Sequence, residues 1–365
     1  MEAEQWDAFG DALKEAGQLL QRREIRDDPL TRAEGYRYLT RLLRLSLEKN
    51  IEFSDPRFPQ FYSLSHETAK IGNDNPDNFY MNCEISGEYD YRIRGQRGTI
   101  PYLSIESKAG SYGSSGTMEP TGHLELDELV MDEGGNFEIL VSATPKPGNW
   151  LPLREDSDNL LVRQTFHDRV AESPASLSIE CLNAAGSNVL LAENFQQQLA
   201  AAPQFINGTA NLFADWMQLF SEHVNQLPPN DQSMCLRAGG DPSIYYHNSF
   251  WQLSEDEALV IELSPPQCKT WNFQLSNYWM ESLDYRYHRI HVNKHNAVYS
   301  NDGSVQIVVA AQDPGKAYPN WLTTAGHALG GMLLRYVEAE SQPPVEARVV
   351  KTQELNCANG QGGGR

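Results

Sequence analysis

The feature that most constrains the fold of this 365-residue chain is a pattern that occurs twice along it. Five matched features recur in the same order. Segments 78–80 and 90–92 of the first copy match 277–279 and 284–286 of the second, strand 134–141 matches 302–309, and turn 147–151 matches 314–322. An apolar strand with an arginine follows in each copy, Arg163 in the first and Arg335 in the second. Each copy then closes with a further strand, 177–182 and 345–351. Turn chemistry shared by all β-rich chains is the alternative explanation. We interpret the pattern as two related β units.

The segments outside the two copies have apolar residues at helical spacing. The fold class expected is therefore mainly β: two related antiparallel β-sandwich or jelly-roll-like units with N-terminal helices and a helical connection. The expected domains are N-terminal helices over 1–50, a first β unit over 51–182, a helical connection over 183–232, a second β unit over 233–351 and a disordered tail over 352–365. Apolar residues of the connection are expected in the core, and at the junction they could also floor a pocket. Separately, the Gly/Ser loop 108–122 could lie over a pocket.

The formal charge of −20 excludes two classes of partner. Binding nucleic acid needs a basic footprint, and so does docking on an anionic membrane. The sequence contains no apolar run of about 18 residues, so it predicts no membrane span, and no secretory signal is visible. The five cysteines are far apart and lack CxxC spacing, which fits a reducing compartment. We therefore expect a cytoplasmic protein, and homo-oligomerisation stays open.

Known catalytic and cofactor motifs do not occur in the sequence. There is no nucleophile elbow, no HExxH motif and no phosphate-binding loop, so we expect no cofactor. His288, His291 and His295 are spaced in a way that suggests a metal site. On a strand, however, His288 and His291 would face opposite sides, so we expect no metal there.

The polar and aromatic residues that suggest a site are concentrated in segment 271–337. His327 lies among small residues and could act as a general acid or base, or could simply bond the backbone. Asp284 and Arg286 are expected on one strand face, where they could orient a ligand or form a surface ion pair. These three residues are the catalytic candidates.

The substrate-binding candidates are amide, carboxylate and aromatic side chains near the repeated motifs. Each also has a structural explanation, since buried amides need partners and Asx side chains satisfy local backbone. The candidates are Gln274, Asn277, Trp279, Trp321, Tyr80, Asn75 and Asp77. For Trp321 the structural explanation, a turn held by a packed indole, is preferred.

Two sets of motifs resemble known bacterial families. The first set is similar to the domain of unknown function 1214. It consists of Trp271-x-Phe273-Gln274-Leu275-x-Asn277-x-Trp279 and the Asp-Gly, Pro-Gly, Asn-Trp-Leu and Thr-Ala-Gly-His motifs that follow it. Asn75-Pro76-Asp77-Asn78-x-Tyr80 and the segment 162–169 are similar to the domain of unknown function 1254. The resemblance covers most of residues 70–350. It implies two β-sandwich or jelly-roll-like units side by side and no established activity.

These observations support three hypotheses about function. The first is a cofactor-independent lyase, isomerase or hydrolase that acts on a small or medium-sized apolar molecule with a polar group, in a pocket of the second β unit. The second is a non-catalytic carbohydrate- or lipid-binding protein, because the fold alone does not decide between the two. The third is a structural or assembly protein in which the tryptophans pack subunits.

Overall fold

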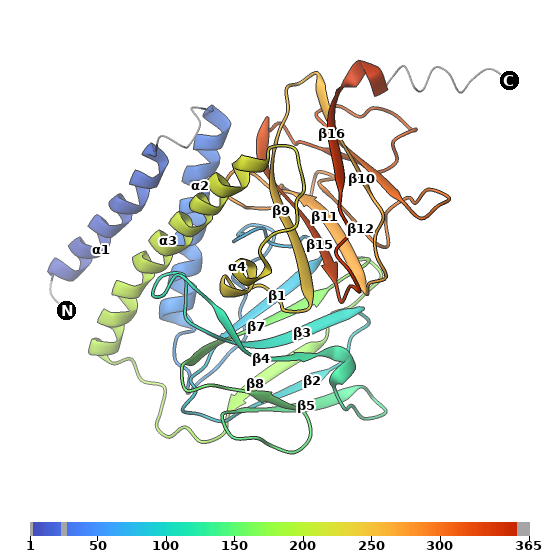
Figure 1. Ribbon diagram of the computed structural model, residues 1–365. Coiled ribbons are helices and arrows are strands. Elements are labelled where there is room, and N and C mark those ends of the chain that lie inside the picture. Colours follow the sequence, from blue (N-terminus) through green and yellow to red (C-terminus); the bar gives the residue numbers. More distant parts are fainter. Residues whose placement is uncertain (1–2, 23–27, 356–365) are drawn as a thin grey trace.

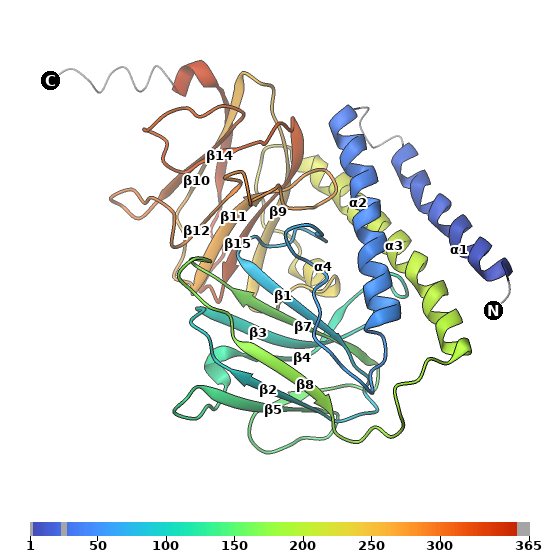
Figure 2. The same cartoon turned by 180° about the vertical axis from the view of Figure 1, so that it is seen from behind.

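The structure is a computed structural model that describes residues 3–22 and 28–355. Figures 1 and 2 show two β units stacked on one another, with α1, α2 and α3 packed along one side. The mainly β fold class with two units and added helices is confirmed.

Residues 78–181, all of them described, form two four-stranded sheets with the orders β1-β7-β3-β4 and β6-β5-β2-β8. The strands are β1 Asn78–Glu84, β2 Tyr91–Gln96, β3 Tyr102–Ala109, β4 Glu119–Glu125, β5 Asn136–Ser142, β6 Trp150–Pro152, β7 Ser157–Thr165 and β8 Ser176–Cys181. Apolar side chains from both sheets share one buried core that includes Ile93, Ile105 and Val162. The first unit is therefore a β-sandwich.

Residues 244–351, also fully described, form two further sheets with the orders β9-β15-β11-β12 and β14-β13-β10-β16. The strands are β9 Ile244–Gln252, β10 Glu257–Leu263, β11 Thr270–Leu275, β12 His291–Asn293, β13 Val305–Ala310, β14 Trp321–Thr323, β15 Leu329–Val337 and β16 Glu346–Lys351. Their core includes Trp271, Phe273 and Leu334. When β1 to β8 are matched in order with β9 to β16, the two sheet orders are identical, so the internal duplication holds at the level of topology.

The repeated Asn-Trp turn makes the same hydrogen bonds in both units. The Asn320 side chain donates to the carbonyls of Val298 and Gln306 and accepts from the N–H of Val298. Asn149 makes the three corresponding bonds in the first unit. The Trp321 indole donates to a main-chain carbonyl of β13 at 3.1 Å. These bonds fix the parallel pairing of β14 with β13, and of β6 with β5, in otherwise antiparallel sheets.

One part of the proposed repeat is wrong. Segments 78–80 and 90–92 belong to β1 and the start of β2, whose counterparts by topology are β9 and β10. Segments 277–279 and 284–286 lie instead in the long connection between β11 and β12. The shared letters reflect Asx and aromatic residues used in different local structures.

Helices α1, α2 and α3 cover one side of the two units (Figure 1). The helical segments are α1 Ala3–Ala16, η1 Gly17–Gln21, α2 Pro29–Leu47, η2 Glu48–Glu52, η3 Leu126–Glu128, α3 Ala192–Phe220, η4 Ser221–His223 and α4 Gln232–Arg237. The α2 helix begins after Asp28, whose carboxylate accepts from the N–H of Thr31, and Pro29 occupies the first turn. Gly35 of α2 allows Trp279 to approach, and the Trp279 indole donates to the carbonyl of Thr31.

In the described ranges, no helix is both long enough and apolar enough to cross a bilayer. Residues 352–355, at the start of the predicted disordered tail, are helical, and the rest of that tail lies outside the described residues.

Candidate functional site

A cavity of about 140 Å³ lies between the two β units. Alternate residues of β1 and β7 line it from the first unit, and alternate residues of β9 and β15 line it from the second. These side chains point away from the sandwich cores because neighbours along a strand face opposite sides. The strand residues that line the cavity are Asn78, Tyr80, Asn82, Glu84, Asn159, Leu161, Arg163, Ile244, Tyr246, Asn248, Leu333 and Arg335.

The remaining walls come from the helical connection and from several loops, among them residues 71–74 and 110–118. Phe205, Phe213 and Trp216 of α3 line one side, and Tyr112 and Met118 of the Gly/Ser loop line another. This confirms the expectation that the connection floors a pocket at the junction and that loop 108–122 lies against it. The cavity is therefore aromatic on its helical side and polar on its strand side.

Two tyrosine–arginine pairs stand at equivalent positions in the two units. Tyr80 on β1 is directly opposite Arg163 on β7, and Tyr246 on β9 is directly opposite Arg335 on β15. Both arginines are almost fully buried, with 7% of Arg163 and 5% of Arg335 exposed. Each pair lies on the sheet face that lines the cavity.

Each arginine is held by the segment that leads into the other unit. Arg335 donates to the carbonyl of Asn73, which precedes β1, and Arg163 donates to the carbonyl of Gly239, which precedes β9. Both acceptor residues have a positive φ, 58° at Asn73 and 87° at Gly239. The exchange of lead-in segments explains why the cavity is shared by the two units.

The environment of Arg163 is a closed set of charges. Glu106 on β3 pairs with Arg163 and, at 2.5 Å, with Lys108, and the Asp241 carboxylate lies 3.7 Å from Arg163. The side chains of Glu106, Lys108 and Asp241 are completely buried. Burial acts to lower the pKa of Arg163, but the two carboxylates outweigh it and raise that pKa.

Glu106 and Asp241 are also the only described carboxylates that meet a histidine, His123, closely enough to form a three-residue set that could hold a metal ion. Both carboxylates already face Arg163, and Glu106 also bonds Lys108. A metal would have to compete with two buried cations for these oxygens. The set is better suited to ion pairing than to binding a metal.

The environment of Arg335 has the same geometry without the charges. At the Glu106 position stands Gln274, whose oxygen accepts from Arg335 at 2.5 Å. At the Lys108 position stands Ser276, and at the Asp241 position stands Asn75. Burial lowers the pKa of Arg335. Among residues 28–355, no carboxylate lies within the 4.0 Å of an ion pair with this guanidinium.

Four of the predicted substrate-binding residues lie at or beside the cavity. Tyr80 lines it, and Gln274 bonds the lining residue Arg335. The backbone N–H of Asn75 donates to the Tyr80 hydroxyl at 2.9 Å. Asp77 lies behind them and accepts from His291 and from Asn293.

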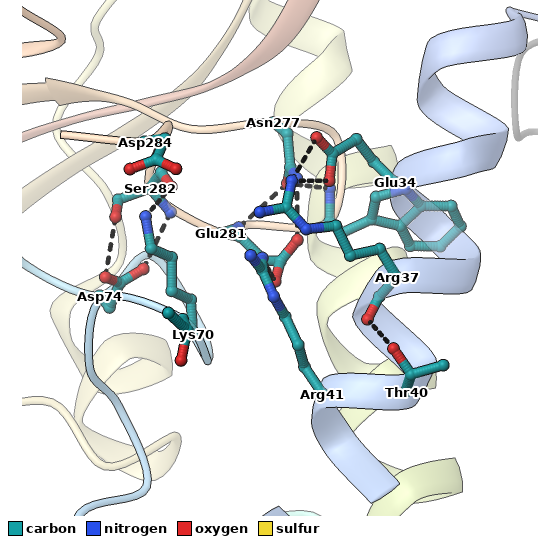
Figure 3. Close-up of polar contacts among 12 residues, drawn as sticks. Glu34, Arg37, Thr40, Arg41, Lys70, Asp74, Asn277, Glu281, Ser282 and Asp284 are labelled. Atoms are coloured by element: carbon teal, nitrogen blue, oxygen red, sulfur yellow. Dashed lines mark hydrogen bonds and ion pairs between the residues drawn. The ribbon is translucent and has the colours of Figure 1, made fainter. Parts of the chain in front are cut away.

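Asn277 and Trp279 lie in the β11–β12 connection next to α2, and Asp284 and Arg286 lie farther along the same connection, where Figure 3 shows Asp284 near Asp74 and Lys70. Asn277 bonds Glu281, which in turn pairs with Arg41 of α2. Asp284 and Arg286 form a bidentate ion pair two residues apart in this loop, and the hydrogen bond from Arg286 lowers the pKa of Asp284 to about 2. The expectation that they share a strand face is wrong, because the sequence period of two here belongs to a turn.

His327 also lies outside the set of cavity-lining residues. Its Nδ1 is 3.2 Å from the carbonyl of Thr324, and its Nε2 is 3.9 Å from a carboxylate oxygen of Glu34. Trp321 bonds its neighbouring strand and is not a lining residue either.

The three spaced histidines lie in different surroundings and contact different residues. His288 lies in a turn of the β11–β12 connection, His291 contacts Asp77 at 3.1 Å, and the ring of His295 stacks on that of His167. The strand that His288 and His291 were expected to share begins only at His291.

Sequence reasoning used Arg163 and Arg335 as markers of the repeat and did not include them among the site residues. The signal that could have found them is an arginine in the middle of an otherwise apolar strand, which requires a buried partner. Comparing the two copies would then have shown a glutamate at position 106, which can pair with Arg163, and a glutamine at the matching position 274, which leaves Arg335 without a carboxylate.

The structure is thus a duplicated β-sandwich with an aromatic and polar cavity at the junction of its two units. Residues 250–340 match the family described as a protein of unknown function, DUF1214. No curated protein matches the chain. The crystal structure of an uncharacterized protein from Burkholderia cenocepacia is similar over 96% of this chain and 97% of its own, with 48% sequence identity and a TM-score of 0.93.

The chain therefore belongs to the same family as the Burkholderia cenocepacia protein. The VPA0106 protein from Vibrio parahaemolyticus shares the fold, with a TM-score of 0.50 and 12% identity over 87% of this chain and 98% of its own.

Proposed function

We propose that this protein binds a small or medium-sized apolar organic molecule with a polar group in the cavity between its two β units. The observation that carries the proposal is the division of the cavity into an aromatic side and a polar side. Ligand sites commonly combine an apolar lining with a few buried polar groups, and they often lie at the junction of two units. The proposed site is shared by both units, whereas the sequence placed it in the second.

Non-catalytic binding is the version that the geometry favours. The ionisable lining residues are mainly engaged with protein partners, as in the 2.5 Å pair between Lys49 and Glu84. The burial of the Cys235 thiol raises its pKa to about 12, which makes it a poor nucleophile near neutral pH.

A cofactor-independent enzyme that uses His327 is the second candidate. It is favoured by the approach of Glu34 to the imidazole, since a carboxylate that faces a histidine is a common acid–base arrangement. Unchanged turnover of an identified substrate by His327→Ala would remove this candidate.

The test of the binding proposal uses N-phenyl-1-naphthylamine, a neutral probe whose fluorescence rises in apolar surroundings. We expect saturable binding by the wild-type protein. Leu161→Trp should abolish it, because Leu161 is a lining residue and the larger ring would fill the cavity. Val130→Trp adds the same side chain at a position that is 74% exposed and should leave binding unchanged.

A native mass spectrum of the purified protein adds a second measurement. An organic molecule that leaves on denaturation would identify the ligand class. Absence of probe binding by both the wild type and the control variant would refute the proposal.

Two finer expectations remain proposals. We infer a cytoplasmic location, supported by the free thiols of the described cysteines Cys83, Cys181, Cys235 and Cys268. Cell fractionation tests it. We also propose that the N-terminal half is related to the domain of unknown function 1254, and a family alignment over residues 70–170 would test this.

A further inference from the structure

The two units carry the same buried frame with different charge. In the first unit's frame, Arg163 and Lys108 are balanced by Glu106 and by Asp241 from the segment that leads into the second unit, so the four side chains sum to zero. In the second unit's frame, Ser276, Gln274 and Asn75, the last from the segment that leads into the first unit, are uncharged, and Arg335 alone carries a charge. The difference between the two frames is one positive charge at the cavity.

The register supports this comparison position by position. Arg163 is opposite Ser104 on β3, and Arg335 is opposite Asn272 on β11. Two residues farther along each strand stand Glu106 and Gln274. The hydroxyl of Tyr80 accepts from the N–H of Asn75, and that of Tyr246 accepts from the N–H of Asp241, both at 2.9 Å.

The nearest carboxylates of the second unit's frame are committed elsewhere. Asp74 accepts from the N–H and the hydroxyl of Ser282, with the Lys70 ammonium close by (Figure 3). Asp77 accepts from Asn293 and contacts His291. Neither supplies an ion pair to Arg335.

Several donors near Arg335 have no protein acceptor. Its guanidinium has five N–H groups, and the described residues accept hydrogen bonds from it only at Gln274 and Asn73. The hydroxyls of Tyr80 and Tyr246 each accept a backbone N–H, and within residues 28–355 neither donates its own hydrogen. A buried cation with unused donors costs stability unless an anion joins it.

We propose that the polar group of the ligand is a carboxylate, bound by Arg335 and by the hydroxyls of Tyr80 and Tyr246, on a molecule whose apolar body lies against the aromatic residues of α3. This inference rests on the proposed binding function and names its ligand class. The planar guanidinium matches a carboxylate in shape, and the single unbalanced charge calls for a monoanion.

The test compares octanoate with 1-octanol by isothermal titration calorimetry, because the two probes share a chain and differ in the charged head. We expect the wild type to bind octanoate at least about tenfold more tightly, as a hydrogen-bonded charge pair typically gives. Acetate, which has the head without the chain, should bind far more weakly than octanoate.

Two variants test whether Arg335 causes the preference for octanoate over 1-octanol. Arg335→Gln should abolish it, with 1-octanol still bound. Asn75→Asp keeps Arg335 and adds a carboxylate where Asp241 stands in the first unit, so it should also abolish the preference by supplying an internal counter-ion. Because the first unit accommodates an aspartate at this position, Asn75→Asp decides the matter if Arg335→Gln does not fold.

The outcomes separate this inference from the binding function on which it rests. Equal wild-type affinity for octanoate and 1-octanol, with N-phenyl-1-naphthylamine still bound, overturns the carboxylate assignment alone. An octanoate preference that survives in folded Asn75→Asp also overturns it. Failure of the neutral probe to bind removes the cavity function itself.

Discussion

The substitution Glu106→Gln tests the idea that the first unit's buried charges form one balanced set. Glu106 bonds both Arg163 and Lys108, and all three side chains lie at the junction of the two units. Glutamine has the same shape and removes the charge. Lys108 would then keep only the carbonyl of Gly240, and Arg163 would keep Asp241 at 3.7 Å.

The expected loss of unfolding free energy follows from the burial of these groups. The side chains of Glu106 and Lys108 are completely buried, so solvent screens neither of them. Breaking a buried ion pair by removing one partner costs about 3–5 kcal/mol, because the other charge stays buried. Since Lys108 is left without its carboxylate, we expect the upper half of this range.

Equilibrium urea denaturation of both proteins measures the loss. The matched control is Asp156→Asn, which breaks the pair between Asp156 and Arg154 on the surface. Exposed pairs contribute little, so this variant should unfold almost as the wild type does. If Glu106→Gln is no less stable than Asp156→Asn, the balanced set does not stabilise the fold as we describe.

A second substitution in the same set sharpens the result. Lys108→Met keeps the apolar part of the side chain and removes the positive charge that Glu106→Gln leaves without its carboxylate. The double variant should therefore be more stable than the sum of the two single changes implies, by about 0.5–3 kcal/mol for residues in direct contact. Simple additivity would show that the two side chains act independently.

Two further predictions concern helix packing and pH. Gly35→Ala should destabilise the protein by about 1–3 kcal/mol, because the new Cβ would stand 2.5 Å from Trp279, whereas Gly10→Ala, with no neighbour within 4 Å, should be neutral or slightly stabilising in thermal melts. Burial acts to lower the pKa of His123, but the hydrogen bond to Glu125 and the nearby carboxylates of Asp241 and Glu106 together outweigh it and raise the pKa above 6.5. The stabilisation is thus present below pH 6.5 and lost as the pH rises through the raised pKa. Urea denaturation should therefore show the wild type losing stability relative to His123→Gln as the pH rises above 6.5. An identical pH profile for the two proteins would contradict this.

The sequence was informative about the units and less so about the site. Strand alternation and the paired Asn-Trp turns predicted the duplication because both are local, and the structure gives Asn149 and Asn320 the same three bonds. The segment at Asp284 and Arg286 looked like a strand because an i, i+2 ion pair in a turn has the same period. The polar side of the cavity could not be predicted from either copy alone, since Arg163 and Arg335 each bond the segment that leads into the other unit.

The divergence of the two frames is itself informative about selection. A buried arginine with a neutral frame is less stable than one with a paired carboxylate, and a single change at position 75 or 274 would bring a carboxylate near Arg335. In the first unit, the corresponding positions hold Asp241 and Glu106, which shows that the fold accommodates such groups. A neutral frame around Arg335 agrees with the proposed ligand carboxylate, since selection for stability alone would favour a carboxylate in the frame. On this view the first unit's frame stabilises the junction, and the second unit's frame leaves one charge for the ligand to neutralise.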